Sequence, residues 1–116
     1  MDIPTTNDFL LEFGIEPVEV DPTLGLSRYI FTSLSDGLQL DISFSLIMRS
    51  FQVILKDKNG KNLVVVSSEK LLSIRLIREG LLAKINVVFD LKGLNSELCV
   101  TVEPELSFHW WLIENN

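Results

Sequence analysis

Residues that usually carry chemistry are scarce in this sequence, which holds one cysteine and one histidine among its 116 residues. Cys99 has no second cysteine with which to form an internal disulfide, and no basic neighbour that would lower its pKa. His109 has no second histidine to complete a metal site and no evident partner for acid–base catalysis. We therefore expect an inert thiol, no catalytic, metal or cofactor site, and no enzymatic activity.

Long apolar runs, basic leader segments and glycine-rich loops are also missing. The opening "MDIPTTNDFLLEFG" has neither the basic start of a signal peptide nor the length of a membrane span, so we expect a soluble cytoplasmic protein with no membrane partner. The segment "KDKNGKN" has a single glycine and indicates a turn, not a phosphate-binding loop. Because the net charge is -6 and the basic segment 49–84 contains Phe51 as its only aromatic residue, we expect no nucleic-acid partner.

Basic residues are absent from residues 1–26, which carry six acids, whereas acids and bases balance in the rest of the chain. Acids without interspersed bases repel one another, and a fold tolerates them either as solubilising charge or because a cationic partner binds there. The sequence leaves both interpretations open. The candidate partner-binding acids are Asp8, Glu12, Glu16, Glu19 and Asp21.

One short helix is expected near the N-terminus, in "TTNDFLLEFG". Thr6 or Asn7 can cap its first amides, and Gly14 can adopt the left-handed conformation that ends it. The following "IEPVEVDPTLGL" contains two prolines and a glycine, which interrupt any long element and leave room for a short edge strand at 18–20.

From Ser27 onwards the apolar residues recur with a period of two, which indicates β-strands. In "LQLDISFSL" the pattern places Leu40 and Leu46 on one face and Asp41 on the other. The NG pair in "KDKNGKN" predicts a type I′ turn, in which both central residues have positive φ.

Residues 71–78 fit a helical period as well, but the β-branched Ile74 and Ile77 and the regular turn spacing favour a strand. Counting strands in this way, we predict a single domain over residues 1–116 that is mainly β. The expected architecture is an antiparallel β-sandwich or partial barrel of about eight strands with one short N-terminal helix.

Two adjacent tryptophans stand in the last predicted strand, "LSFHWWLIENN". Because neighbours on a strand point to opposite faces, Trp110 belongs to one face and His109 and Trp111 to the other. One indole therefore falls on a face that a short antiparallel strand usually turns toward water. It is either half covered by the helix or a loop, or part of a protein interface, and His109 and Trp111 join the candidate partner-binding residues.

The segments "NDFLLEFGIEP", "SRYIFTSLSDGLQLDISF" and "FQVILKDKNGKNLVVV", followed by the aromatic last strand, give a small, acidic, cysteine-poor β protein. This chain resembles the immunity proteins of bacterial contact-dependent growth inhibition and related polymorphic toxin systems. The resemblance implies a non-enzymatic protein that binds one cognate toxin domain, usually a nuclease, and blocks its active site or substrate surface. A nuclease has a basic phosphate-binding cleft, which clustered carboxylates would match in charge.

A second interpretation is a β-domain that binds a small ligand, a sugar or a lipid, beside the tryptophans. Indole rings stack well on apolar ligand faces, and small barrels offer a mouth for such a ligand. The sequence leaves the oligomeric state open.

Overall fold

The computed structural model describes residues 2–92 and 94–114, with side chains described as far as Trp111. Its contacts divide the chain into two compact units. The terminal unit comprises Met1–Ile15 and Lys70–Asn116, and the central unit comprises Glu16–Glu69.

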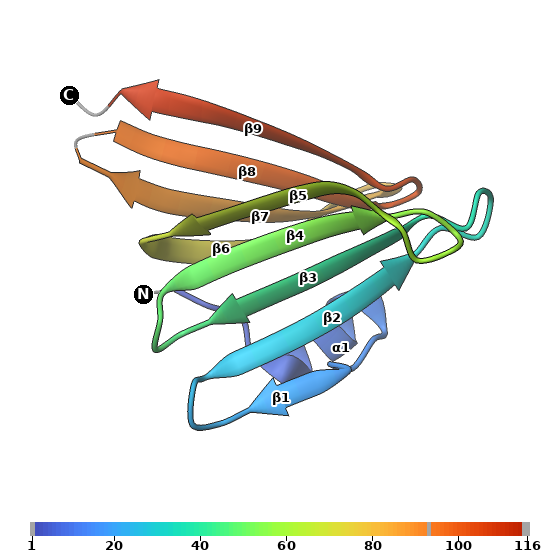
Figure 1. The fold of residues 1–116 in the computed structure, drawn as a ribbon, viewed down its shortest axis with the longest axis horizontal. Helices are drawn as coiled ribbons and strands as arrows, with labels where there is room; N and C mark the ends of the chain where they lie inside the picture. Colours follow the sequence, from blue (N-terminus) through green and yellow to red (C-terminus); the bar gives the residue numbers. More distant parts are fainter. Residues whose placement is uncertain (1, 93, 115–116) are drawn as a thin grey trace. The chain divides into compact units, whose positions relative to one another are not determined.

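The terminal unit contains one helix and a four-stranded antiparallel sheet of order β6-β7-β8-β9 (Figure 1). Its elements are α1 (Thr6–Phe13), β6 (Leu71–Glu79), β7 (Leu82–Leu91), β8 (Leu94–Glu103) and β9 (Ser107–Glu114). Each strand pairs with the next one along the chain, so short connections suffice.

Helix α1 is held at its start by a capping box. The Thr5 hydroxyl accepts a hydrogen bond from the Asp8 amide at 3.1 Å, and the Asp8 carboxylate accepts one from the Thr5 amide at 2.8 Å. Gly14 ends the helix with a φ of 70°, as expected. The predicted helix is confirmed, but the capping residue is Thr5 and not Thr6 or Asn7, because only Thr5 lies three residues before an acid that returns the hydrogen bond.

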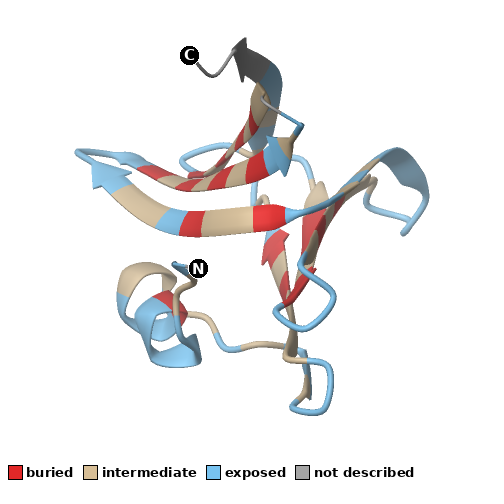
Figure 2. Cartoon of the chain, turned by 90° about the vertical axis from the view of Figure 1, so that its left-hand side faces the viewer, coloured by how far each residue is buried: buried red, intermediate tan, exposed pale blue. Residues whose placement is uncertain are grey.

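The apolar residues that alternate along the terminal sheet form its buried face (Figure 2). Register aligns Leu76 with Ile85, and Ile85 with Val100. Phe9 of α1 is fully buried as well. Residues 71–78 belong to a strand, which confirms the choice made over a helix. The buried strand residues are Leu71, Ile74, Ala83, Ile85, Val87, Phe89, Leu98, Val100 and Val102.

The central unit is a five-stranded antiparallel meander in which sequence order and spatial order coincide. Its strands are β1 (Glu19–Asp21), β2 (Leu26–Thr32), β3 (Gln39–Ser45), β4 (Ser50–Lys56) and β5 (Asn62–Glu69).

One face of the central sheet is aromatic. The rings of Tyr29 and Phe44 stack with centroids 6.3 Å apart, and Phe51 continues the stack at 6.3 Å from Phe44. The predicted type I′ turn is wrong, because only Gly60 of the NG pair has positive φ. Asp57 organises a longer turn instead, accepting hydrogen bonds from two later backbone amides, those of residues 59 and 61.

Among the described residues, nine strands in two antiparallel sheets and one short helix confirm the mainly β prediction. The strands are divided between two sheets and do not close into one barrel. The single domain over 1–116 stays a prediction. No helix within the described residues has the length and apolar character needed to cross a membrane.

Candidate functional site

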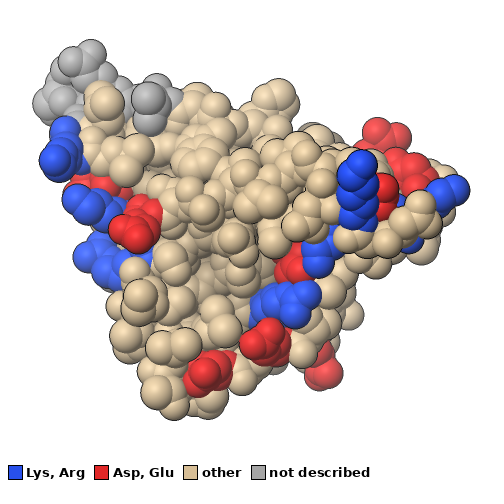
Figure 3. Space-filling model, in the orientation of Figure 1, with Lys and Arg blue, Asp and Glu red and all other residues tan. Residues whose placement is uncertain are grey.

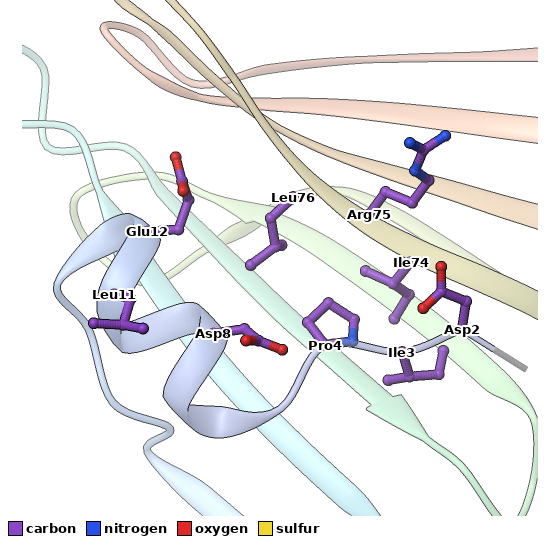
Figure 4. Close-up of a pocket in the computed structure, with 9 residues that line it drawn as sticks. All are labelled: Asp2, Ile3, Pro4, Asp8, Leu11, Glu12, Ile74, Arg75 and Leu76. Carbon is purple, nitrogen blue, oxygen red and sulfur yellow. The ribbon is translucent and has the colours of Figure 1, made fainter.

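Two of the predicted acids line a hollow in the terminal unit, between α1 and β6. Asp8 and Glu12 face it from the helix (Figure 4). Ile74 and Leu76 point from β6 toward the helix and the N-terminal segment, whereas Arg75 points to the other side of the strand (Figure 4). The hollow measures about 450 Å³ and is lined by Asp2, Ile3, Pro4, Asp8, Leu11, Glu12, Ile74, Arg75 and Leu76.

Both predicted acids of this hollow are already engaged within the fold. Asp8 belongs to the capping box, and the Glu12 carboxylate accepts a hydrogen bond from Arg78 Nε at 2.8 Å. Arg78 Nη2 also donates to the Glu12 carbonyl at 2.9 Å and to the Glu103 carboxylate at 2.8 Å. These bonds to Glu103 and Glu12 raise the pKa of Arg78. The hollow therefore has the acids Asp8 and Glu12 at its edge. Arg78 links the adjacent helix α1 to the sheet.

The other three predicted acids belong to the central unit. Glu19 lies on β1 with its carboxylate 3.5 Å from Arg28 Nη1, and the Asp21 carboxylate accepts a hydrogen bond from the Thr23 amide at 2.9 Å. Glu16 is exposed and makes no ion pair with any described residue. The five acids are contiguous in sequence, but neither unit contains all of them.

Sequence reasoning placed Asp41 on a polar face and missed its environment. The residue is 5% exposed. Arg28 donates two hydrogen bonds to its carboxylate, from Nε to Oδ1 at 2.8 Å and from Nη2 to Oδ2 at 2.7 Å. Lys56 Nζ lies 3.1 Å from Oδ2. Register explains the cluster: Asp41 stands opposite Ile30 on β2 and Ile54 on β4, so both cations reach it diagonally across the sheet.

The Asp41 cluster is a structural element and not a site with spare binding capacity. The hydrogen bonds from Arg28 lower the pKa of Asp41, and the same bonds raise the pKa of Arg28. A carboxylate with three donors has little left to offer a ligand. On the face of the molecule drawn in Figure 3, several Lys and Arg side chains lie next to acids.

The two tryptophans occupy opposite faces of β9, as predicted. Trp110 stands opposite the buried Leu98, packs its ring 5.7 Å from that of Phe89, and donates its indole N–H to the buried Ser96 hydroxyl. Trp111 lies on the other face. The two side chains are similarly exposed, at 38% for Trp110 and 40% for Trp111, so the core-facing indole is only partly covered.

His109 shares the outward face with Trp111, and register places it opposite Cys99. Burial raises the pKa of the Cys99 thiol, which agrees with the expectation of an unreactive cysteine. Among residues 2–92 and 94–114, no group of three His, Cys, Asp or Glu side chains has an arrangement that could hold a metal ion.

The acidic hollow and the outward aromatic pair lie on opposite faces of the terminal sheet. Helix α1 packs on the face to which Leu76 and Arg78 belong, and Leu76 aligns through Ile85 and Val100 with Phe108. His109 and Trp111 lie on the opposite face of the sheet. A partner with one flat surface cannot cover both.

A second hollow, on the central sheet, was not foreseen. Short serine side chains of β3, β4 and β5 leave a depression of about 630 Å³ there, and Phe44 and Phe51 of the aromatic stack also line it. Its polar lining consists of Ser43, Ser45, Ser50, Gln52, Ser67, Ser68 and Glu69. Beside it, the β3–β4 turn exposes Leu46, Ile47 and Met48. Only the register of three strands brings these serines together, and the sequence alone does not provide that register.

The mainly β fold with two antiparallel sheets is shared with a solved structure. A chain of a contact-dependent growth inhibition toxin–immunity protein complex from Klebsiella pneumoniae 342 superposes with a TM-score of 0.85. The match covers 97% of this chain and 96% of the other, at 19% sequence identity. The fold therefore agrees with the resemblance to immunity proteins of contact-dependent growth inhibition that the sequence indicated. No protein-family model matches the sequence, and no curated protein matches it.

Proposed function

We propose that the chain is an immunity protein that acts in the cytoplasm by binding a cognate toxin domain and blocking its active site or substrate surface. The observation that carries this proposal is the fold shared with a chain of a toxin–immunity complex over nearly the whole length of both chains. The net charge of -6 supports a partner with a basic surface, and a nuclease domain has such a surface. On this proposal the protein blocks a reaction and catalyses none.

The first test needs the cognate toxin domain, which is to be sought among the genes next to the one that encodes this chain. Expression of that toxin domain alone should arrest growth, and co-expression of this chain should restore it. The two proteins should also co-purify in a one-to-one complex. Restored growth without a complex, or a complex that leaves toxin activity intact, would refute the proposal.

The acidic residues are proposed to speed association with the toxin. Changing Glu16, Glu19 and Asp21 to amides should lower the association rate by roughly three- to tenfold at low ionic strength and reduce its dependence on salt. Stopped-flow or surface plasmon resonance at two salt concentrations measures this. Asp8→Asn with Glu12→Gln tests the hollow of the terminal unit separately, and the exposed Glu105→Gln is the matched control. Equal rates for all variants at low salt would exclude electrostatic steering by these acids.

The outward aromatic residues are proposed as a separate contact, because they lie on the sheet face opposite α1. Trp111→Ala should weaken toxin binding by about 2 kcal/mol or more if the indole is buried by the partner, with His109→Ala weakening it less. Calorimetric titration gives the affinity, and thermal unfolding shows whether the fold persists. A loss of folded protein without a loss of affinity would assign Trp111 to the fold instead.

The serine-lined hollow supports a second candidate function, the binding of a polar small ligand such as a sugar. Its volume of about 630 Å³ lies within the range of ligand pockets, and its hydroxyls offer donors and acceptors. The tryptophans do not line it, so the ligand would not stack on them as the sequence suggested. Nuclear magnetic resonance titration with a sugar library, read at Ser43, Gln52 and Ser67, distinguishes this function from toxin binding.

A further inference from the structure

The sheet edges of this protein are protected to very different degrees. Strand β1 has only three residues and ends in an acid followed by Pro22, a short charged edge of the kind that resists pairing. Strand β6 is partly occupied, because its Ile74 amide donates to the Asp2 carbonyl at 2.9 Å and Asp2 forms a parallel bridge with Ser73. Strand β5 has neither form of protection: it spans eight residues and carries no charge before Glu69.

Strand β5 exposes apolar side chains on both of its faces. Leu63 is 49% exposed, Val64 39% and Val65 51%. Among the residues that the structure describes, its ladder runs only to β4, so the other edge presents N–H and C=O groups that no described strand pairs with. A long apolar edge of this kind is a template for another strand.

The ends of β5 show which strand fits this edge. Lys61 directly precedes the strand and Glu69 ends it, both are exposed, and neither forms an ion pair with a described residue. An antiparallel copy of β5 centred on Val65 would place Val64 opposite Val66 and Lys61 opposite Glu69, and twofold symmetry would form each pair twice. In this register the charged ends pair and Val64, Val65 and Val66 meet one another, whereas Leu63 lies opposite Ser67.

We propose that a second copy of this chain pairs antiparallel to β5 and joins the two five-stranded sheets into one continuous sheet. The partner is a copy and not an unrelated strand, because the matching charge and apolar pattern come from β5 itself. The contact is one strand wide, and interfaces that small are weak. We therefore expect the dimer to form at protein concentrations of roughly 10 to 500 µM. This proposal does not depend on the immunity function.

Light scattering coupled to size exclusion, together with analytical ultracentrifugation, measures the mass over that concentration range. The wild-type mass should rise from 13.2 kDa toward twice that value. Val65→Lys places like charges directly opposite each other and should abolish the rise, while circular dichroism confirms that the variant is folded. The matched control is Leu81→Lys, at a strongly exposed residue of the β6–β7 turn, which should leave the rise unchanged.

A charge exchange tests the register. Lys61→Glu sets two acids against each other and should weaken the dimer at least fivefold, and adding Glu69→Lys should restore it. A wild-type chain that stays at 13.2 kDa up to 500 µM would overturn the proposal. A dimer indifferent to Val65→Lys, or a charge exchange that fails to restore association, would overturn it as well. A monomer that loses toxin binding on Val65→Lys would assign the edge to the toxin instead.

Discussion

The two units each contain an ion network around one central residue, and the two networks have opposite composition. In the terminal unit, Arg78 stands between the carboxylates of Glu12 and Glu103. In the central unit, Asp41 is held by two cations, Arg28 and Lys56. The first network joins a helix to a sheet, and the second joins three strands of one sheet.

The difference between them is burial. The side chain of Arg78 is 40% exposed, so water can solvate its charge if a partner is lost, whereas that of Asp41 is 6% exposed. Exposed ion pairs contribute little to stability, and breaking a buried pair is costly because the remaining charge stays desolvated. The comparison predicts that the two networks contribute very differently to the free energy of unfolding, although their hydrogen bonds have similar geometry.

The largest effect is expected from Asp41→Asn, which keeps the shape of the side chain and removes its charge. Two cations then face each other across β3 without their anion. Loss of a buried partner costs about 3–5 kcal/mol, and because Arg28 is one-third exposed we expect roughly 2–4 kcal/mol. Urea unfolding measures the change, with Asp90→Asn, an exposed acid on a strand, as the control. A loss as small as that of the control would remove the distinction between the networks.

The second-largest effect is expected from acid, which should weaken the network of Asp41, Arg28 and Lys56 in the central unit. The bonds from Arg28 hold the folded pKa of Asp41 below its ordinary value of 3.8. Its contribution to the free energy of unfolding is therefore complete above about pH 5 and is lost as the pH falls through the lower, folded pKa. The difference in unfolding free energy between wild type and Asp41→Asn should stay constant from pH 7 to about pH 5 and narrow in stronger acid. An unchanged difference at pH 2 would contradict the assigned cause.

The smallest effect is expected from Arg78→Met. Because the arginine is exposed, its loss should change the free energy of unfolding less than the matched Arg28→Met, and the change should shrink further in 0.5 M salt. Unfolding of both variants in urea at two salt concentrations makes the comparison direct. Equal losses in the two arginine variants would show that the helix depends on Arg78 as strongly as the central sheet depends on Arg28.

Alternation of side chains predicted most of the fold, because one buried face per strand leaves a clear period of two. The prediction failed where a strand ends: Leu46 continues the pattern in sequence, but β3 stops at Ser45 and the residue is exposed in the turn. Alternation also assigns every polar residue of a strand to the open face, which hid the burial of Asp41. Side chains of the two neighbouring strands, β2 and β4, bury Asp41. Only the register of these strands shows that they lie over it.

The candidate partner-binding residues were harder to predict than the fold. Five acids that follow one another in sequence suggested one charged surface, yet Asp8 and Glu12 belong to the terminal unit and the others to the central unit. Alternation alone placed Trp110 and Trp111 on opposite faces, but it did not reveal which indole faces outward. The bond between Arg78 and Glu12 spans 66 residues, and nothing local in the sequence signals it.

The division of the chain has a consequence for the order in which the protein is made. The central unit comes from one continuous stretch, Glu16–Glu69, and can complete its sheet as soon as that stretch leaves the ribosome. The N-terminal segment emerges first, but Asp2 meets Ser73 and Glu12 meets Arg78 only after the central stretch has been synthesised. Helix α1 is therefore translated before the central stretch but gains its contacts with β6 only after that stretch.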